Sequence, residues 1–385
     1  MNLGQYFTTS PLLQDAVFEL IQNAPSVILE PSMGRGDLIQ HVSSKTPNTR
    51  FDCYEIDPSI TFLEGKAEYN LTIGDFLTQQ IDRKYDTIIG NPPYVKQKTR
   101  NLYVDFIARC SQLLSDTGEL IMIVPSDVFK MTSSISVLSE MFATGCITDI
   151  VHPHDERLFK GATIDVIVFR YVKGGQMDTT GCLRYNRRSK SYYYNDFLYL
   201  FPLTTVFSTE TIESMFSIHV GIVSGCESVF KNPIGDTDVI TDISDISADR
   251  TITHKYMYLT DFPSDDSVIT NYLLEHKKTL LKRRIRKFNE SNWFEWGALR
   301  NIEIMRSRMG EPCIYMRNMT RKPIVAVEGT VGLFSGNITC LIPRTPDIPL
   351  DAAVNFFNST MFKSNFEYAG RFRISHRQLS KCCYL

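Results

Sequence analysis

The chain lacks several features that would place it in a common class of protein. Its nine cysteines show no paired Cys-x-x-Cys spacing, which argues against a zinc site or a disulfide framework and indicates a reducing compartment. No apolar run is long enough to span a bilayer and no signal peptide opens the chain, so we predict no membrane partner and a cytoplasmic location. The formal net charge is only −2, so a strongly charged partner would have to be bound through a local cluster of basic residues.

The length of 385 residues is enough for two domains with a core each. Strand and helix signals alternate through roughly the first 170 residues, which predicts an α/β domain with a mostly parallel sheet. Strands are predicted over residues 27–29, 51–57, 85–90, 119–125 and 165–171, and a helix over residues 102–114.

The most informative stretch is Asn-Pro-Pro-Tyr at residues 91–94, directly after a predicted strand. Open α/β sheets bind their ligands at such strand ends. The side-chain oxygen of Asn91 and the main-chain carbonyl of Pro92 can each accept an N–H of a planar, conjugated amine and draw its nitrogen toward tetrahedral geometry. Tyr94 can stack on the ring that carries this amine, and Pro93 stiffens the loop. We interpret the motif as that of an adenine N6 methyltransferase; an ordinary tight turn is the alternative.

Three strand ends before this motif are suited to hold a nucleoside-like ligand. Gly34 and Gly36 follow the first strand and permit close backbone approach, although a lone glycine loop is a weak signal. Glu55 lies at the end of the next strand, where doubly wound folds bind a ribose diol; a merely solvated acid is the alternative. At a third strand end, Asp75 can accept from an exocyclic amine and Phe76 can lie against an adenine ring.

Phe159 lies in a turn-rich segment before the strand predicted over residues 165–171. An aromatic side chain in such a segment either packs in the core or serves a ligand, and the sequence alone does not separate the two.

Taken in order, these motifs resemble those of the gamma-type DNA adenine-N6 methyltransferases of bacterial and viral restriction-modification systems. The resemblance implies a class I S-adenosylmethionine-dependent methyltransferase fold, which is Rossmann-like with a mostly parallel sheet. It also implies S-adenosyl-L-methionine as methyl donor and double-stranded DNA as substrate, with the target adenine flipped out of the duplex. A separate restriction endonuclease is a possible partner, no metal is expected, and the location would be a bacterial cytoplasm, a host cell or a virion.

The resemblance also implies roles for individual residues. The cofactor contacts are Tyr6, Phe7, Thr8, Glu30, Pro31, Gly34, Gly36, Glu55, Ile56, Asp75, Phe76, Asn91 and Phe106. The catalytic motif is Asn91, Pro92, Pro93 and Tyr94, and the flipped adenine is held between Tyr94 and Phe159.

Positive charge gathers in local clusters, as a DNA-binding enzyme of low net charge requires. The densest run lies between His276 and Lys287, where apolar residues would anchor one face of a helix and leave a basic stripe for phosphates. A solvated surface helix is the alternative. The predicted DNA contacts are Lys282, Arg283, Arg284 and Arg286 in this run and Lys96, Lys98 and Arg100 after the catalytic motif. Arg184, Arg187, Arg188 and Lys190, followed by Tyr192 to Tyr194, form a second patch.

Composition changes after a glycine-containing turn at residues 173–176. We predict a catalytic domain over residues 1–173 and a mixed α+β target-recognition domain over residues 177–385, with DNA in a basic cleft between them. Trp293 and Trp296 fit a core better than base reading.

An RNA methyltransferase and a protein-glutamine methyltransferase are the main alternatives, because both substrates present a planar nitrogen to the same acceptors. Glutamine methyltransferases of that kind usually place a small helical domain before the catalytic fold, whereas here about 200 residues follow it. A non-catalytic nucleic-acid-binding protein is disfavoured by the intact motif at residues 91–94, and nothing in the chain indicates a fused nuclease.

Overall fold

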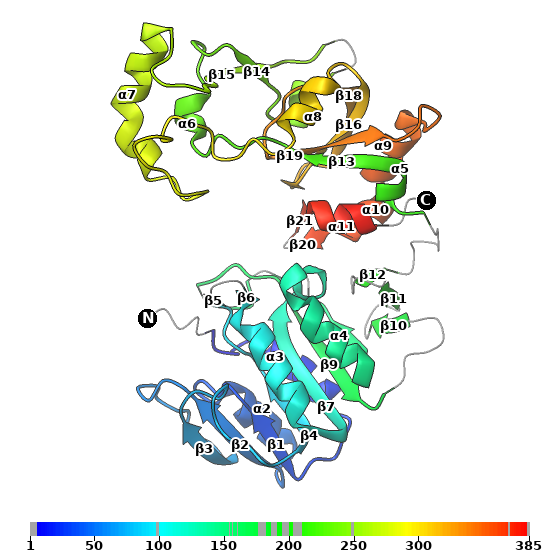
Figure 1. Ribbon diagram of the computed structural model, residues 1–385. Helices are drawn as coiled ribbons and strands as arrows, with labels where there is room; N and C mark the ends of the chain where they lie inside the picture. The colour runs from blue at the N-terminus through cyan, green and yellow to red at the C-terminus, as the bar shows by residue number, and fades with distance from the viewer. Residues whose placement is uncertain are drawn as a thin grey trace. The chain divides into compact units, whose positions relative to one another are not determined.

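The computed structural model describes residues 6–382 except 98–99, 154, 156, 160, 176–181, 186–190, 195–199, 203–209, 248–249 and 369. The chain divides into two compact units, residues 1–204 with 368–370 and residues 205–367 with 371–385 (Figure 1). Each unit contains its own hydrophobic core.

The first unit is built on a ten-stranded sheet with the order β12-β11-β10-β8-β9-β7-β4-β1-β2-β3. Its strands are β1 (Val27–Glu30), β2 (Arg50–Glu55), β3 (Glu68–Ile73), β4 (Tyr85–Gly90), β7 (Leu114–Pro125), β8 (Gly145–Val151), β9 (Val166–Lys173), β10 (Cys182–Tyr185), β11 (Ser191–Tyr194) and β12 (Leu200–Pro202). Strands β3-β2-β1-β4-β7 run parallel, and β9 is antiparallel to both β7 and β8.

This topology confirms the predicted mostly parallel α/β sheet. The chain adds β2 and β3 on one side of β1 and then crosses to add β4 and β7 on the other, so the strand order reverses between β1 and β4. Ligands of doubly wound sheets bind at the carboxyl ends of the strands at this reversal. The sheet continues through β10, β11 and β12, past the turn at which the sequence predicts the boundary between domains.

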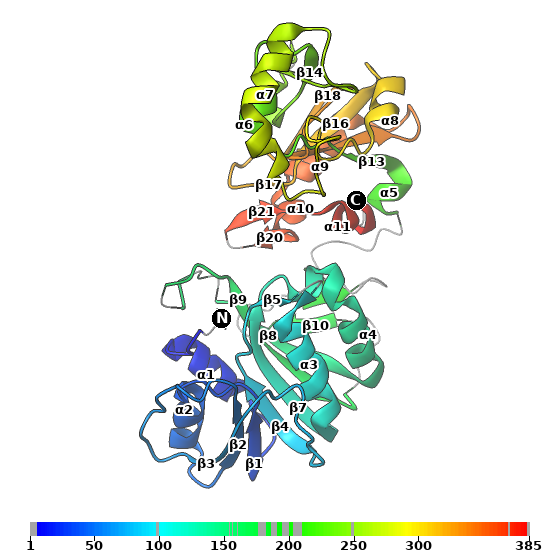
Figure 2. The ribbon, with the colours of Figure 1, turned by 60° about the vertical axis from the view of Figure 1, so that its left-hand side comes forward.

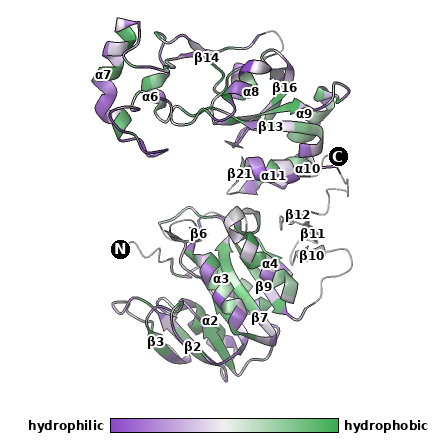
Figure 3. Ribbon diagram, viewed as in Figure 1, coloured by the Kyte–Doolittle hydropathy of each residue, from purple (hydrophilic) through white to green (hydrophobic). Residues whose placement is uncertain are grey.

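Four helices cover the two faces of the central sheet. Helices α3 (Leu102–Leu113) and α4 (Ile135–Thr144) lie on one face, and α1 (Pro11–Leu20) and α2 (Asp37–Lys45) on the other (Figures 1 and 2). Successive residues of a strand point to opposite faces, so Ile88 packs beneath α3 and Ile89 beneath α1 and α2. Because both faces are covered, long stretches of the central strands are apolar, as Figure 3 shows for residues 120–125 of β7 and 166–169 of β9.

A buried carboxylate fastens the end of α1 to this sheet. Glu119 of β7 has no solvent exposure and accepts the main-chain N–H groups of Gln22 and Asn23, which follow α1. The hydroxyl of Thr87 and the guanidinium of Arg170 donate to the same carboxylate, at 2.9 and 2.8 Å. With its polar atoms satisfied, this network holds α1, and thus the segment before it, at a fixed place on the sheet.

The second unit is a mixed α+β structure around a four-stranded antiparallel sheet with the order β13-β19-β16-β18. Its strands are β13 (Phe216–Val220), β14 (Thr237–Val239), β15 (His254–Tyr256), β16 (Pro312–Arg317), β17 (Met319–Thr320), β18 (Ala326–Thr330), β19 (Ile338–Pro343), β20 (Glu367–Tyr368) and β21 (Arg371–Arg373). Its helices are α5 (Ile212–Met215), α6 (Glu227–Phe230), α7 (Ser267–Leu281), α8 (Ile302–Ser307), α9 (Leu350–Asn358), α10 (Thr360–Ser364) and α11 (His376–Lys381).

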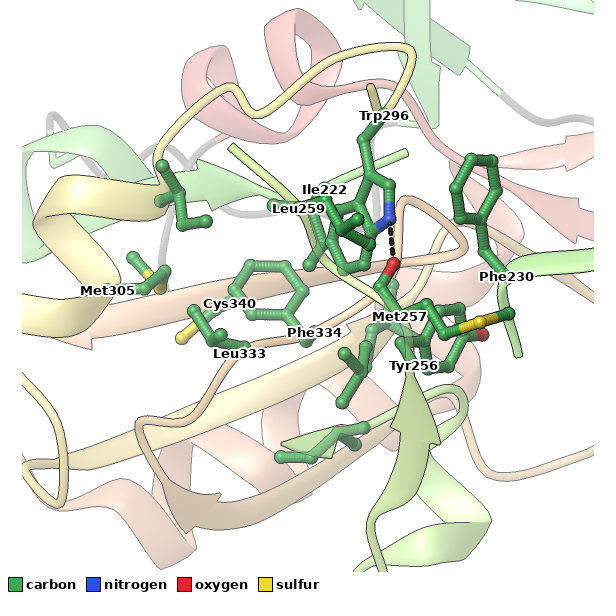
Figure 4. Close-up of a cluster of buried hydrophobic side chains, with 14 of the residues drawn as sticks. Ile222, Phe230, Tyr256, Met257, Leu259, Trp296, Met305, Leu333, Phe334 and Cys340 are labelled. Atoms are coloured by element: carbon green, nitrogen blue, oxygen red, sulfur yellow. Dashed lines mark hydrogen bonds between the residues drawn. The ribbon is translucent and has the colours of Figure 1, made fainter. Parts of the chain in front are cut away.

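Both tryptophans of the chain belong to the core of this second unit. Trp293 and Trp296 are 2% and 3% exposed, which confirms the core prediction for them. The indole N–H of Trp296 donates to the main-chain oxygen of Met257 at 2.7 Å, and its ring packs edge-on against Tyr256 and Phe230 (Figure 4).

The prediction that one helix carries the basic run as far as Lys287 is wrong. Helix α7 ends at Leu281, and the residues from Arg283 onward leave it. The reason is tertiary: the guanidinium of Arg283 turns back to the carbonyl of Leu280 and also binds three carbonyls outside the helix. Charge periodicity along the chain carries no information about such contacts.

Candidate active site

A hollow at the carboxyl ends of β1 and β4 brings together three segments that are distant in sequence. It is lined by Tyr6, Phe7, Thr8, Glu30, Ser32, Met33, Gly34, Asp37, Leu38 and Asn91. The predicted N-terminal motif, glycine loop and first catalytic residue therefore share one site, at the reversal point of the sheet.

The glycine loop takes a shape that other residues rarely adopt. Gly34 and Gly36 have φ angles of 57° and 91°, in the left-handed region. A Cβ atom on Gly34 would lie 3.1 Å from the Phe7 ring, so a side chain there would also crowd the hollow. Gly36 is the residue before α2, and Arg35 pairs with Asp37 at 2.7 Å while lying over the Phe7 ring.

Glu55 holds the glycine loop from the end of β2. One carboxylate oxygen accepts the N–H of Gly34 at 2.8 Å and the other accepts the N–H of Asp57 at 2.9 Å. Each oxygen keeps a second lone pair, so Glu55 can still accept from a ligand hydroxyl. The neighbouring Ile56 is 52% exposed.

The residues predicted to contact adenine lie outside the lining of the hollow. Phe76 stacks on Phe106 with 5.5 Å between ring centroids, and Tyr54 packs edge-on against Phe76. Asp75 accepts the main-chain N–H of Leu77 at 3.0 Å. The rings of Tyr54, Phe76 and Phe106 form an aromatic cluster beside the ends of β2 and β3.

The amide of Asn91 has a defined orientation. Its nitrogen donates to the main-chain oxygen of Tyr6 at 2.8 Å and to the hydroxyl oxygen of Thr8 at 3.1 Å. Because a carbonyl oxygen can only accept, the contact with Tyr6 fixes which end of the amide faces the N-terminal segment. The side-chain oxygen of Asn91 is thereby presented on the other side.

The hydroxyl of Tyr94 donates a hydrogen bond to this side-chain oxygen of Asn91. The hydroxyl oxygen lies 2.5 Å from Asn91 Oδ1 and 3.1 Å from the main-chain oxygen of Ile123. Burial raises the pKa of the Tyr94 hydroxyl well above its usual range, so it remains a proton donor. The acceptor that an incoming amine would need is therefore filled by a residue of the same motif.

The rings of Tyr6, Tyr94 and Phe159 form a closed aromatic cluster. Their centroids lie 5.8 to 6.0 Å apart, and Phe159 stands edge-on to Tyr94 at an interplanar angle of 77°. A base stacked between two rings needs about 7 Å between them, twice a van der Waals contact. Tyr94 or Phe159 must therefore move before a base can enter.

A polar network that the motifs did not reveal fixes the segment carrying Phe159. Asp165, only 3% exposed, accepts the Ser126 hydroxyl at 2.5 Å and lies 2.8 Å from His152 Nε2. The three residues come from the ends of β7, β8 and β9 and bracket the segment around Phe159. Their separation along the chain leaves no sequence signal for the network.

Glu30 differs from the other acids of the site because it is buried without a partner. It is 2% exposed, and neither carboxyl oxygen has a hydrogen-bond partner among the described residues. The pKa of Glu30 is raised to about 8, chiefly by burial and in smaller part by the charge of Glu55, while the neighbouring groups of Ser32 offset part of the rise.

The predicted DNA contacts fall into three groups. Lys96 is exposed and lies on β5 (Lys96–Gln97), which pairs with β6 (Arg100–Asn101); Lys98 lies outside the described residues, as do Arg187, Arg188 and Lys190 of the second patch. Lys282 and Arg284 are exposed. Arg286 pairs with Glu295 at 2.5 Å, at the edge of a hollow of about 460 Å³ that Trp296 also lines.

Arg283 is a correction to that prediction. It is not a free surface cation: it donates four hydrogen bonds to main-chain carbonyls and stacks 3.7 Å from the centroid of Phe288. Its guanidinium is used to hold the second unit together and is not available to a phosphate.

Two features are absent from the described part of the chain. Nowhere in it do three or more His, Cys, Asp or Glu side chains gather in a way that could hold a metal ion. None of its helices combines the length and the apolar character needed to cross a membrane.

Comparisons with known proteins agree with the motifs. The family model described as Eco57I restriction-modification methylase matches residues 43–159. The type II methyltransferase M.HincII of Haemophilus influenzae is 26% identical over 211 residues, which cover 49% of this chain and 41% of that protein. The type II methyltransferase M.CvrRI of Paramecium bursaria Chlorella virus XZ-6E is 30% identical over 189 residues, which cover 43% of this chain and 48% of that protein.

Among solved structures, the M protein of the type I restriction enzyme EcoKI is 17% identical, with a TM-score of 0.37 and 44% of each chain covered. The chain spans less than half the length of the two curated relatives. The family match includes the Asn-Pro-Pro-Tyr motif, and the sheet order fits the predicted fold class. Residues 43–159 therefore carry an Eco57I restriction-modification methylase domain, in a unit with the class I S-adenosylmethionine-dependent methyltransferase fold.

Proposed function

We propose that the protein transfers a methyl group from S-adenosyl-L-methionine to the N6 amine of adenine in double-stranded DNA. The observation that carries the proposal is the orientation of Asn91, whose amide nitrogen is tied to Tyr6 and Thr8 so that its oxygen is presented as an acceptor. The family match and the type II methyltransferase relatives support DNA as the substrate.

The residues of the hollow fit the proposed cofactor. The left-handed Gly34 lines the hollow and leaves room for a ligand where a side chain would intrude, whereas the lack of a Cβ on Gly36 allows Met33 and Ile39 to pack closely. Glu55 retains lone pairs for ribose hydroxyls, and the buried carboxyl of Glu30 suits the ammonium group of the donor's amino-acid end. When bound, S-adenosyl-L-methionine supplies an electrophilic methyl group.

The chain's own residues would prepare the target amine. The oxygen of Asn91 and the carbonyl of Pro92 accept its two N–H groups and pull electron density from the ring onto the nitrogen. Because the methylated amine is a strong acid, its extra proton passes to water and no carboxylate base is required. Tyr94 must first leave Asn91 and can then stack on the base, opposite Phe159.

Adenine inside a duplex is out of reach of such a pocket, so the proposal includes flipping of the target nucleotide. The second unit would recognise the DNA site, and the exposed residues Lys96, Lys282 and Arg284 would contact phosphates. A separate restriction endonuclease is proposed as the functional partner.

The test is incubation of the purified chain with labelled S-adenosyl-L-methionine and unmethylated genomic DNA, followed by nucleoside mass spectrometry. N6-methyladenine confined to one short sequence is the expected result, and Asn91→Ala should abolish it while donor binding survives. Detection of N4-methylcytosine instead would mean that the target base is cytosine, whose exocyclic amine is also conjugated. Label in RNA or in a protein glutamine, with none in DNA, would overturn the substrate.

A further inference from the structure

One carboxyl group of the candidate active site, that of Glu30, lies in surroundings that disfavour its charged form. Glu30 is buried, its two oxygens have no hydrogen-bond partner among the described residues, and it lines the same hollow as Asn91. An ionised carboxylate without a partner is strongly destabilised in such surroundings, so the group takes up a proton. Few buried carboxyls are left in this state unless a ligand later supplies the partner.

The position of Glu30 connects it to the reacting end of the site. A Cβ atom built on Gly90, the residue before Asn91, would lie 3.1 Å from Glu30 Oε1. The carboxyl therefore borders the part of the hollow from which a methyl group must reach the amine at Asn91. A positive charge entering this part would find Glu30 as a buried acid without a basic partner.

We propose that Glu30 is uncharged in the free protein and ionises when the ammonium group of the donor's amino-acid end enters, so that binding releases a proton. This inference rests on the proposed cofactor. It makes Glu30 a selector of ligand charge, because only a ligand that brings a cation compensates the buried carboxylate.

Unlike Glu30, the other acids close to it have hydrogen-bond or ion-pair partners. Glu55, on β2, is engaged by the N–H groups of Gly34 and Asp57. Asp37, at the start of α2, pairs with Arg35. Cys53 on β2 and Cys110 on α3 also face Glu30, and burial raises the pKa of both thiols well above their usual range, so they stay neutral.

Titration calorimetry of the full chain with S-adenosyl-L-methionine at pH 7, in two buffers of different ionisation enthalpy, counts the released protons. With the pKa of Glu30 at about 8, roughly nine tenths of a proton per ligand is expected. Glu30→Gln should release almost none. Glu64→Gln, which changes an exposed carboxyl of the same unit, should release as many as the wild type.

A ligand without the ammonium group serves as a control in the same calorimetry. 5′-Methylthioadenosine lacks the amino-acid end and should bind the wild type without releasing a proton. The affinity of the wild type for S-adenosyl-L-methionine should rise roughly ninefold from pH 6 to pH 7, because the ionised fraction of Glu30 rises by that factor. Over this range the ammonium of the ligand stays mostly charged. This measurement keeps the proposal testable should Glu30→Gln fail to fold.

The outcomes separate the inference from the function on which it rests. Binding of S-adenosyl-L-methionine with no proton released, or with equal release from wild type and Glu30→Gln, overturns the role of Glu30 and leaves the cofactor in place. No binding by the wild type overturns both.

Discussion

Replacing Arg283 should unfold the second unit far more readily than replacing its neighbour Arg284. The Arg283 guanidinium donates to the carbonyls of Leu280, Ser224, Glu295 and Trp293 at 2.5 to 2.9 Å. Alanine would leave all four acceptors without this donor. Burial lowers the pKa of Arg283 to about 10, so the side chain is still charged at neutral pH.

The size of the effect follows from these contacts. Four half-buried hydrogen bonds contribute about 1 kcal/mol each, and stacking on Phe288 adds about 1 kcal/mol. We expect Arg283→Ala to lower the free energy of unfolding by about 4 to 5 kcal/mol. Arg284→Ala removes an exposed side chain and should change it by less than about 0.5 kcal/mol.

The assay is urea denaturation followed by tryptophan fluorescence. Both tryptophans of the chain, Trp293 and Trp296, are buried in the second unit, so the signal reports that unit alone. With a denaturant slope of about 2 kcal/mol per molar, the midpoint of Arg283→Ala should fall by about 2 M. Arg283→Lys should recover little, because an ammonium cannot span four carbonyls as a planar guanidinium does.

The exposed neighbours of Arg283 should show the opposite behaviour, with an effect on DNA binding and none on stability. Replacing Lys282 and Arg284 together should weaken DNA binding and flatten its salt dependence while leaving the urea midpoint unchanged. If Arg283→Ala is as stable as the wild type and loses only DNA affinity, the structural role assigned to Arg283 is refuted.

Three further predictions concern the first unit. Without ligand, Glu30→Gln should become more stable than the wild type as pH rises. The raised pKa of Glu30 means that the wild type loses stability between about pH 4.5 and 8, and glutamine does not titrate. Measured by chemical denaturation, the difference in free energy of unfolding should grow from almost nothing at pH 4 to about 3 kcal/mol at pH 7. Thr8→Val should lower kcat about tenfold by loosening the catalytic amide, with Thr8→Ser restoring it; an unchanged kcat counts against the orienting role. Tyr94→Phe should keep kcat within about threefold, since stacking remains, whereas Tyr94→Ala should lose about a hundredfold; equal losses would mean that the hydroxyl itself is needed.

The sequence by itself determined the architecture of the first unit and the location of its site. Apolar strand patterns predict β1, β2, β4, β7 and β9 along the chain, because period and burial are local properties, whereas β8 (Gly145–Val151) carries no prediction. The Asn-Pro-Pro-Tyr motif and the glycine loop fall at strand ends, and parallel strands bring such ends to one edge. The predicted residues Thr8, Glu30 and Asn91 do share one hollow.

Only the tertiary structure decided what several of these side chains do. Asn91 is oriented by the carbonyl of Tyr6, and its acceptor is filled by Tyr94; both contacts depend on atoms placed by the fold. Arg283 looks like its exposed neighbours in the sequence, yet it donates to three carbonyls of two other segments, at Ser224 and at residues 293–295. Glu30 gains its proton because packing excludes water from it. Residue type and spacing establish which groups are present, whereas burial and hydrogen-bond partners, which set charge and orientation, arise from long-range packing.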